Sequence, residues 1–446
     1  MKRIAITIVA AALLAGCTVH PKGEREERDI AIAAGKTYEK PVEERQLPPL
    51  SDRPTADDLV RFALLNSAEV ERAYWEWRAA LEQVPIDGTQ ATNLSLSLSS
   101  SVVNGNTSWG QTTITAGNDP MADIVLPNKL DAAARRSLEM ARAAGKRFHK
   151  MQLELRAKVL DAYYDYALNA ELIRLSRQNI AWLQITRTLA DTRVRTGGGS
   201  QAELLKAENE LDMALNDLAN LQAQLPANRA MINALLNRPA LADLPVPDAV
   251  PSTGPVNGDD AAILGAIDSD NPELKALAHE IRSRKVGIET ASLQYQPDFS
   301  ISAATDLRGI TQTLSSMITV PILKYEAIHA TIAQAEANLK AAEAARRQSK
   351  SDLAAQAISD LVTLRDVDRQ LSLFEQTILP RAKQIVPVTR QSYETGRGSL
   401  LELFDAQRSL LDIERLVANL RTTRNKRLAS IEAMGAPLYP VPANTH

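Results

Sequence analysis

The chain has 446 residues, a length that leaves room for more than one structural unit. Aromatic residues make up only 4% of the sequence, which favours long helices in thin layers over one thick globular core. A formal net charge of −3 argues against a nucleic-acid-binding protein, which would carry a concentrated basic face.

The N-terminus has the pattern of a secretory signal peptide, predicted for residues 1–16. Lys2 and Arg3 precede an apolar run from Ile4 to Leu14 that is too short to cross a bilayer as a mature helix. The following "LAGC" ends at Cys17, the only cysteine, so no intrachain disulfide can form. This tetrapeptide resembles the lipobox of bacterial lipoproteins, which implies that Cys17 becomes a lipidated N-terminus. The alternative is a buried or incidental thiol.

A polar arm is predicted for residues 17–55. It contains five prolines and an almost fully charged run from Glu24 to Asp29. We therefore expect a tether or a wrapping arm here, without a contribution to the core.

Residues 56–236 are predicted to form the first of two repeats. A helical pattern from Ala56 to Val84 gives way to strict alternation in "NLSLSLSSSV", so a strand pair is expected over about residues 92–127. Helical character then continues to Gly197, a length of about 105 Å at 1.5 Å per residue. After the glycines, leucines recur every seven residues, which is typical of helices packed side by side. They are Leu204, Leu211, Leu218 and Leu225.

A proline-rich linker is predicted for residues 237–260, and the same order of elements begins again in a second repeat over residues 261–436. Alternation in "DFSISAATDL" predicts a second strand pair over about residues 298–322. A second long helix follows, and a C-terminal tail is assigned to residues 437–446. A break or bend of this helix is expected at two prolines, Pro380 and Pro387.

Nearly the same motif occurs at both Gly-rich turns. "TGGGSQAELLKAENEL" begins at Thr196, and "TGRGSLLELFDAQRSL" begins 199 residues later, at Thr395. Glycine tolerates the left-handed backbone that a tight turn between two helices demands. Each half is therefore predicted to consist of a helix, two strands, a long helix, a Gly turn and a final helix.

This order of elements, together with "SYETGRGSLLELFDAQRSLLD", resembles the TolC-type outer-membrane efflux proteins, and "LLELFDAQRSLL" is most similar to their lipoprotein members. The resemblance covers about residues 57–436. It implies a mainly α-helical fold with a small β part: a tandem repeat whose coiled-coil-like helices form a trimeric periplasmic α-barrel. Two strand pairs per protomer would contribute to a twelve-stranded β-barrel.

The resemblance also implies a function and partners. The protein would be a passive conduit of a tripartite efflux or secretion system, in the outer membrane of a Gram-negative bacterium and extending into the periplasm. Its partners would be two further copies of the chain, a periplasmic adaptor protein, an inner-membrane transporter of the RND or ABC class, and outer-membrane lipid. Nucleic acid and cofactors are not expected.

By the same resemblance, both Gly turns lie at the periplasmic tip, where the channel meets its adaptor and closes at rest. The expected adaptor-contact residues are Gly197, Gly199, Gly396, Gly398, Leu400 and Leu401. The expected residues of the aperture gate are Tyr393, Glu402, Asp405, Glu203 and Lys206. A basic residue that the family pattern places at Gly398 is absent here. Lys206 stands where Asp405 stands in the second repeat, so alternating charges could replace the usual acidic aperture; solvated helix charges are the alternative.

No catalytic constellation is found in the sequence. The five histidines form no HExxH motif and no close pair, "RTGGGSQ" lacks the Lys-Ser/Thr ending of a P-loop, and no GxSxG motif occurs. We therefore expect neither an enzyme nor a metal site. The rival interpretation is a structural coiled-coil lipoprotein, a periplasmic spacer or scaffold, although its repeats would not need strand pairs.

The second strand pair is expected to be short. Only 24 residues run from Asp298 to Pro321, which leaves two strands of barely the length of about 9–11 residues that spans a membrane. The strand regions also offer few aromatic residues for an interfacial girdle, only Trp109 and Phe299. A short barrel that does not fully cross the outer membrane is therefore a second alternative, with the lipid on Cys17 supplying much of the anchoring.

Overall fold

The computed structural model describes the chain in eight stretches, residues 18–51, 53–89, 94–103, 106–118, 125–247, 249–251, 259–306 and 312–436. The predicted signal peptide, Cys17 and the C-terminal tail lie outside these residues. The chain divides into two units, each assembled from separate stretches of sequence. Unit 1 contains residues up to Lys36, 73–148 and 273–349, and unit 2 contains residues 37–72, 149–272 and from Lys350 onward.

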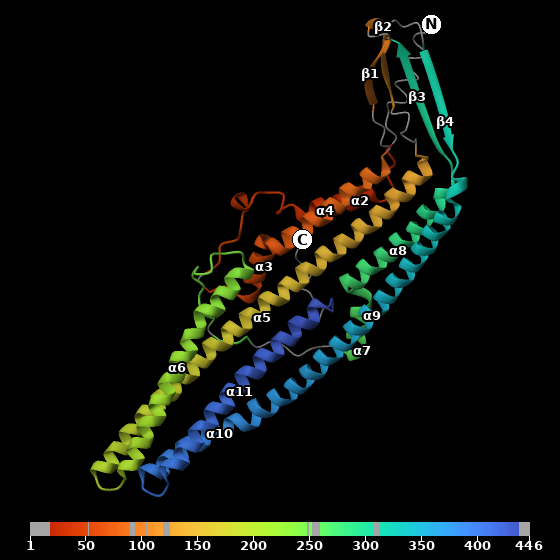
Figure 1. The fold of residues 1–446 in the computed structure, drawn as a ribbon. Helices are drawn as coiled ribbons and strands as arrows, with labels where there is room; N and C mark the ends of the chain where they lie inside the picture. Colours follow the sequence, from red (N-terminus) through yellow and green to blue (C-terminus); the bar gives the residue numbers. More distant parts are fainter. Residues whose placement is uncertain are drawn as a thin grey trace. The chain divides into compact units, whose positions relative to one another are not determined.

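Unit 1 carries the β part of the fold. β1 (Leu94–Val103) pairs antiparallel with β2 (Asn106–Asn118), and β3 (Asp298–Asp306) pairs antiparallel with β4 (Gln312–Thr319). A short antiparallel contact between β2 and β3 joins the two hairpins, so the sheet has the order β1-β2-β3-β4 (Figure 1). Two hairpins from opposite halves of the sequence therefore form one sheet.

Among the described residues, unit 1 contains five α-helices or parts of α-helices, and a small aromatic cluster joins α4 to α5. The helices are α2 (Glu24–Gly35), most of α4 (Ala68–Gly88), the first part of α5 (Pro127–Arg195), α8 (Pro272–Ser292) and the first part of α9 (Tyr325–Leu373). The ring of Phe148 on α5 lies 6.2 Å from that of Tyr74 and 5.6 Å from that of Trp77, both on α4. Gly145 makes this approach possible, because a Cβ there would lie 2.7 Å from Trp77 Cε2. Three of the chain's few aromatic residues thus meet where α4 packs on α5.

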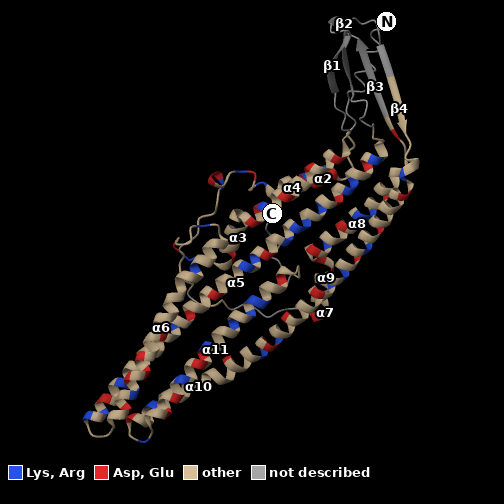
Figure 2. Ribbon diagram, in the orientation of Figure 1, with Lys and Arg blue, Asp and Glu red and all other residues tan. Residues whose placement is uncertain are grey.

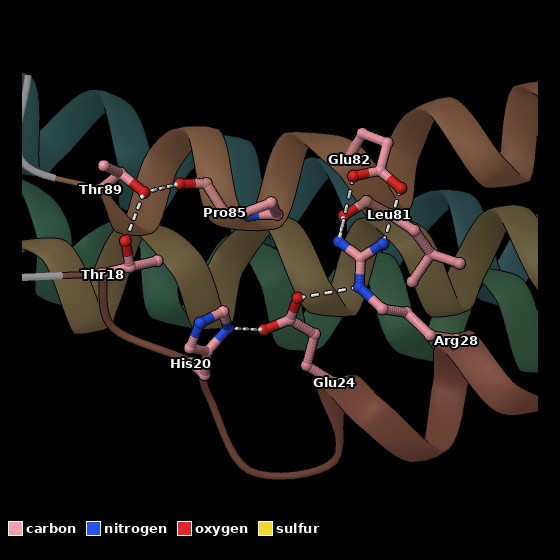
Figure 3. A network of polar contacts seen from close by, with 8 residues as sticks. All are labelled: Thr18, His20, Glu24, Arg28, Leu81, Glu82, Pro85 and Thr89. Carbon is pink, nitrogen blue, oxygen red and sulfur yellow. Dashed lines mark hydrogen bonds and ion pairs between the residues drawn. The ribbon is translucent and has the colours of Figure 1, made fainter.

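The N-terminal arm is folded, so the prediction that it stays out of the core is wrong for α2. Ala31 on this helix is fully buried, and a Cβ on Gly35 would lie 1.9 Å from Tyr74 Cε2. Within the charged run that indicated a tether, Arg28 bonds to Leu81 and Glu82 on α4 (Figure 3). Local sequence could not reveal this packing, because those partners lie more than fifty residues away.

Arg28 is the centre of the polar network that holds α2 to α4. Its guanidinium donates to Glu24 Oε1 at 3.0 Å, to Glu82 Oε1 at 2.6 Å and to the carbonyl oxygen of Leu81 at 2.9 Å. The hydrogen bond from Arg28 is the main cause that lowers the pKa of Glu82. At the start of the arm, Thr89 Oγ1 donates to Thr18 Oγ1 at 3.2 Å (Figure 3). The arm is thereby fastened along α4 up to the residue that follows Cys17.

A second polar cluster of unit 1 surrounds Glu139 on α5. Its carboxylate accepts from Arg142 at 2.6 Å and from Arg282 at 2.8 Å, and it lies 2.8 Å from His279 Nδ1. Burial alone would raise the pKa of Glu139, but these contacts outweigh it and lower the pKa from 4.5 to about 2. Because the pKa of the folded state is depressed, this stabilisation is present above about pH 4.5 and is lost as the pH falls toward 2.

We expect Glu139→Gln to lower the free energy of unfolding by about 2 kcal/mol at neutral pH, somewhat less than the pKa difference alone implies because the site is partly solvated. The difference from wild type should shrink as the pH falls from about 5 to 2, where the wild-type carboxylate becomes protonated. Urea unfolding at a series of pH values measures it. Glu336→Gln, at an exposed position of α9, is the matched control. A difference in the free energy of unfolding between Glu139→Gln and wild type that stays constant with pH would contradict the prediction.

Unit 2 is helical. It contains α3 (Ala56–Asn66), the second part of α5, α6 (Gln201–Leu235), α7 (Asp260–Asp270), the second part of α9, α10 (Leu379–Glu394) and α11 (Leu400–Ala433). The predicted break near Pro380 is confirmed: a π-helical turn, Phe374–Ile378, separates α9 from α10. Proline cannot donate to the carbonyl four residues earlier, and a wider turn accommodates that loss. Pro387, by contrast, lies inside α10 without interrupting it.

A basic run on α11 connects this helix to two neighbours. Arg424 donates to Asp368 on α9 at 2.5 Å, and Arg427 donates to Asp360 on the same helix at 2.9 Å. Lys426 lies 2.6 Å from Asp165 of α5. These lysine and arginine side chains are therefore structural cross-links within unit 2.

The predicted linker belongs to unit 2, and its described residues before α7 contain no helix or strand. Leu244 and Val250 are buried, and the carbonyl oxygens of Leu244 and Pro251 accept from Tyr166 and Asn425. Across the described residues the fold is mainly α with a small β part, as predicted. Both signs of charge are interspersed along the helices (Figure 2). Among the helices that the structure describes, none has a stretch long and apolar enough to cross a membrane.

Candidate functional site at the two helix turns

The two Gly turns have the same backbone geometry. Gly197 and Gly396 both have φ of 76°, the left-handed conformation that the sequence predicted. After α5, the amide of Gly197 donates to Val194 and that of Gly198 to Arg193; after α10, the amide of Gly396 donates to Tyr393 and that of Arg397 to Ser392. This pair of bonds is the Schellman motif, which satisfies helix carbonyls that would otherwise lack a partner.

Gly199 and Gly398 serve a different purpose, close approach of the chain. A Cβ on Gly199 would lie 3.1 Å from Arg193 Cβ, and one on Gly398 would lie 3.0 Å from Ser392 Cβ. The family pattern has a basic residue at position 398. Any side chain there would crowd the preceding helix, which gives a physical reason for glycine at this position.

The serines that follow the glycines cap the next helices, and here the two copies differ. Ser399 Oγ accepts from the amide of Glu402 at 3.2 Å, while Glu402 Oε2 accepts from the amide of Ser399 at 3.1 Å, a complete capping box. Ser200 Oγ accepts from the amide of Glu203 at 3.3 Å, but the Glu203 carboxylate accepts from the Tyr393 hydroxyl instead, at 3.5 Å. Glu203 thus contacts the other turn.

Tyr393 is the residue that joins the two turns. It is fully buried, and the guanidinium of Arg193 lies 4.4 Å from the centre of its ring. Arg193 also donates to the carbonyl oxygen of Tyr393 at 3.0 Å and to that of Gly198 at 2.7 Å. Burial and the negative charge of Glu203 raise the pKa of Tyr393, so its hydroxyl stays protonated as a donor.

Arg193 is a site residue that sequence reasoning missed. The position that corresponds to it 199 residues later is Ser392, so the two copies differ here. The adjacent positions differ as well, with Val194 opposite Tyr393, so no signal in the sequence singled out Arg193.

Leu400 is a correction to the predicted contact residues. Its side chain is 3% exposed, because it belongs to the apolar cluster beneath the turns. That cluster contains Leu183, Ala190, Ala207, Tyr393, Leu400, Leu403 and Phe404. Leu401, which is 53% exposed, is the leucine of this pair that can contact another protein.

Of the four charged residues predicted for the aperture, Glu203 and Glu402 accept hydrogen bonds at the turns, whereas Lys206 and Asp405 form no ion pair among the described residues. Lys206, Glu402 and Asp405 all have exposed side chains, and Glu203 is half-buried. Within the described part of the chain, no ion pair joins Lys206 to Asp405. The structure therefore brings Tyr393 and Glu203 together and leaves Lys206 and Asp405 free to face other molecules.

The comparison with protein families decides which class of protein carries this site. The family described as outer membrane efflux protein matches residues 59–238 and 264–435. The chain belongs to this family.

Curated relatives of the chain are distant. The probable outer membrane lipoprotein SilC of Salmonella typhimurium is 22% identical over 60% of this chain and 60% of its own length. The pyoverdine export outer membrane protein OpmQ of Pseudomonas aeruginosa is 22% identical over 88% of this chain and 87% of its own length. The matched region thus spans less than two thirds of SilC but most of OpmQ.

Solved structures share the fold. The open state of the MtrE outer membrane channel of Neisseria gonorrhoeae superposes with a TM-score of 0.73 and 19% identity, over 86% of this chain and 89% of that one. The outer membrane protein VceC of Vibrio cholerae gives a TM-score of 0.72 and 17% identity, over 86% and 97% of the two chains. The TolC-type fold predicted from the doubled motif is therefore confirmed.

The left-handed glycines allow a test in which one substitution has opposite effects at two positions. Gly396→Ala is expected to lower the free energy of unfolding by about 1–2 kcal/mol, because alanine is strained at positive φ. Gly265→Ala is the matched control, since Gly265 lies in helix α7 with open space where a Cβ would be. This variant should raise the free energy of unfolding by about 0.5–1 kcal/mol. Chemical unfolding of both variants measures the difference. The same sign for both would refute the assigned role of Gly396.

Proposed function

We propose that this protein is the outer-membrane channel of a tripartite efflux system, a passive conduit for substrates that an adaptor and an inner-membrane RND or ABC pump deliver. The observation that carries the proposal is the combination of doubled helical hairpins ending in Gly turns with a four-stranded sheet, in a member of the outer membrane efflux protein family. OpmQ, which most of the chain matches, is named as a pyoverdine export outer membrane protein. On this proposal the chain catalyses no reaction.

The channel would be a homotrimer. One chain contributes four strands, too few to close a barrel, whereas three chains contribute twelve. Large apolar side chains that are more than half exposed on α6 and α9 support this assembly, because a neighbouring copy would cover them. They are Met213, Met231 and Val362, which are 63%, 64% and 64% exposed.

The barrel would be short, with support from lipid on Cys17. β1 and β2 have 10 and 13 residues, enough for a membrane span of about 9–11 residues, whereas β3 has 9, at the lower limit, and β4 has 8, below it. An epitope inserted at Gly309, between β3 and β4, tests whether the second hairpin reaches the cell surface. Antibody binding to intact cells would favour a fully spanning barrel, and no binding would favour the barrel that stops short.

The two turns would form the tip that meets the adaptor and closes the tube. Leu401 and the four glycines would face the adaptor, and the bond between Tyr393 and Glu203, held by Arg193, would fasten the two hairpins of one protomer. In the trimer, Lys206 of one protomer would lie near Asp405 of the next and replace an acidic ring by alternating charges.

Single-particle images and planar-bilayer recordings of the purified full chain test the function. A hollow three-fold tube that conducts ions supports the channel, and a solid rod without conductance supports a structural spacer. Asp405→Arg is expected to raise single-channel conductance if the aperture is held by opposite charges. Asp412→Arg, about two turns further along α11, is the control and should conduct like the wild type.

A further inference from the structure

A polar groove of about 180 Å³ lies between α5, α8 and α9 of unit 1. It is remote in sequence from the turns and serves no role in the proposed gate. Its charged and polar lining includes Arg136, Arg284, Thr290, Gln294, Gln334 and Asn338. No aspartate or glutamate lines it.

The two arginines of the groove are not neutralised within the described structure. The nearby carboxylate of Glu289 is bound by Arg135, which donates two hydrogen bonds to it at 2.7 and 3.1 Å. Ser283 donates to the carbonyl oxygen of Arg136 at 3.1 Å and so holds α8 against α5 at this level. Arg136 and Arg284 are both exposed, and among the described residues neither forms an ion pair. Two helices therefore each contribute an arginine without an ion pair to the lining of one hollow.

We propose that this groove binds a phosphate ester group. A guanidinium offers paired N–H donors whose geometry matches the oxygens of a phosphate, and two of them on separate helices can hold one tetrahedral anion. The side-chain amides of Gln294, Gln334 and Asn338 add neutral donors, which complete the coordination of oxygens that arginine alone leaves unbonded. A hollow of this volume holds a phosphate and part of its ester substituent.

The place of the groove in the fold favours a phospholipid headgroup as the source of the phosphate. Gln294 lies in the single turn Leu293–Tyr295, and β3 begins at Asp298. If the sheet enters the outer membrane, the Gln294 end of the groove is the end nearest the headgroups on the periplasmic side. This choice of source rests on the proposed function, whereas the phosphate chemistry of the groove does not.

Gly287 provides a steric test of the site. It lines the groove on α8, and a Cβ built on it would have no atom within 4 Å. Leucine at this position would extend into the free space while both arginines remain. Gly265 of α7 has the same open surroundings in unit 2 and is the matched control.

Calorimetric titration of the purified full chain tests the proposal with three probes: inorganic phosphate, glycerol 3-phosphate and a short-chain phosphatidylglycerol. We expect saturable binding that Arg136→Gln/Arg284→Gln weakens by about 100-fold, roughly tenfold for each charged hydrogen-bonding partner removed. Gly287→Leu should weaken it at least about tenfold. Arg177→Gln/Arg346→Gln, which removes the same charge elsewhere, and Gly265→Leu should bind like the wild type.

The outcomes distinguish three claims: that the groove binds phosphate, that the phosphate comes from a lipid, and that the protein is a channel. Tight binding of the lipid alone identifies a headgroup site, and equal binding of glycerol 3-phosphate identifies a site for soluble phosphate esters. Absence of binding to all three probes, or binding that survives both groove variants, overturns the proposal. A chain that binds phosphate but forms no conducting tube would reject the proposed function and leave the phosphate site standing.

Discussion

Replacing Tyr393 with alanine is expected to lower the free energy of unfolding by about 3–5 kcal/mol, the loss typical of a large aromatic side chain removed from a core. The ring is fully buried, stacks under Arg193 and belongs to the cluster beneath both turns. Its loss would leave a cavity where the two hairpins of the chain meet. Chemical unfolding of the full chain measures the effect.

Tyr393→Phe separates the ring from the hydroxyl. This variant keeps the packing but removes the donor to Glu203, so it should lower the free energy of unfolding by only about 0.5–1.5 kcal/mol. If the bond fastens a closed tip, the same variant should raise single-channel conductance. Tyr325→Ala is the control, because Tyr325 is 63% exposed. It should change the free energy of unfolding by no more than about 0.5 kcal/mol. Equal losses for Tyr393→Ala and Tyr325→Ala would show that the cluster does not hold the turns together.

Replacing Arg427 with methionine is expected to destabilise the protein by about 3 kcal/mol, because it leaves a buried carboxylate without its cation. Asp360 has a side chain only 1% exposed, and its two oxygens accept from Arg427 at 2.9 Å and from Ser430 at 2.7 Å. Ser430 alone cannot compensate for the charge. Urea unfolding at neutral pH measures the loss.

Removing the carboxylate instead of its cation should destabilise the protein much less. Asp360→Leu leaves Arg427, which is 42% exposed, free to be solvated, so a loss of about 1 kcal/mol is expected. The double variant Asp360→Leu/Arg427→Met should return close to the wild type, since a buried pair replaced by apolar residues is often neutral. A double variant as unstable as Arg427→Met would show that shape, rather than charge, explains the effect.

The doubled motif shows how much of this protein is determined by local sequence. The alternation of apolar and polar residues before Pro127 and before Pro321 predicted both hairpins, and Gly197 and Gly396 predicted the left-handed turns. These features depend on backbone preferences and on residues a few positions apart, which a single sequence displays directly. The bend near Pro380 was predictable for the same reason, because the missing N–H acts on its own helix.

Contacts over long sequence separations were decided only by the tertiary structure. Arg193 bonds to Tyr393, and Arg28 bonds to Glu82, although nothing in the local sequence around either arginine indicates its partner. Leu400 and Leu401 are adjacent leucines with opposite exposure, because the rotation of α11 against the cluster buries only one of them. Burial and pairing are properties of the packed helices, whereas local sequence determines the helices and turns that are available to pack.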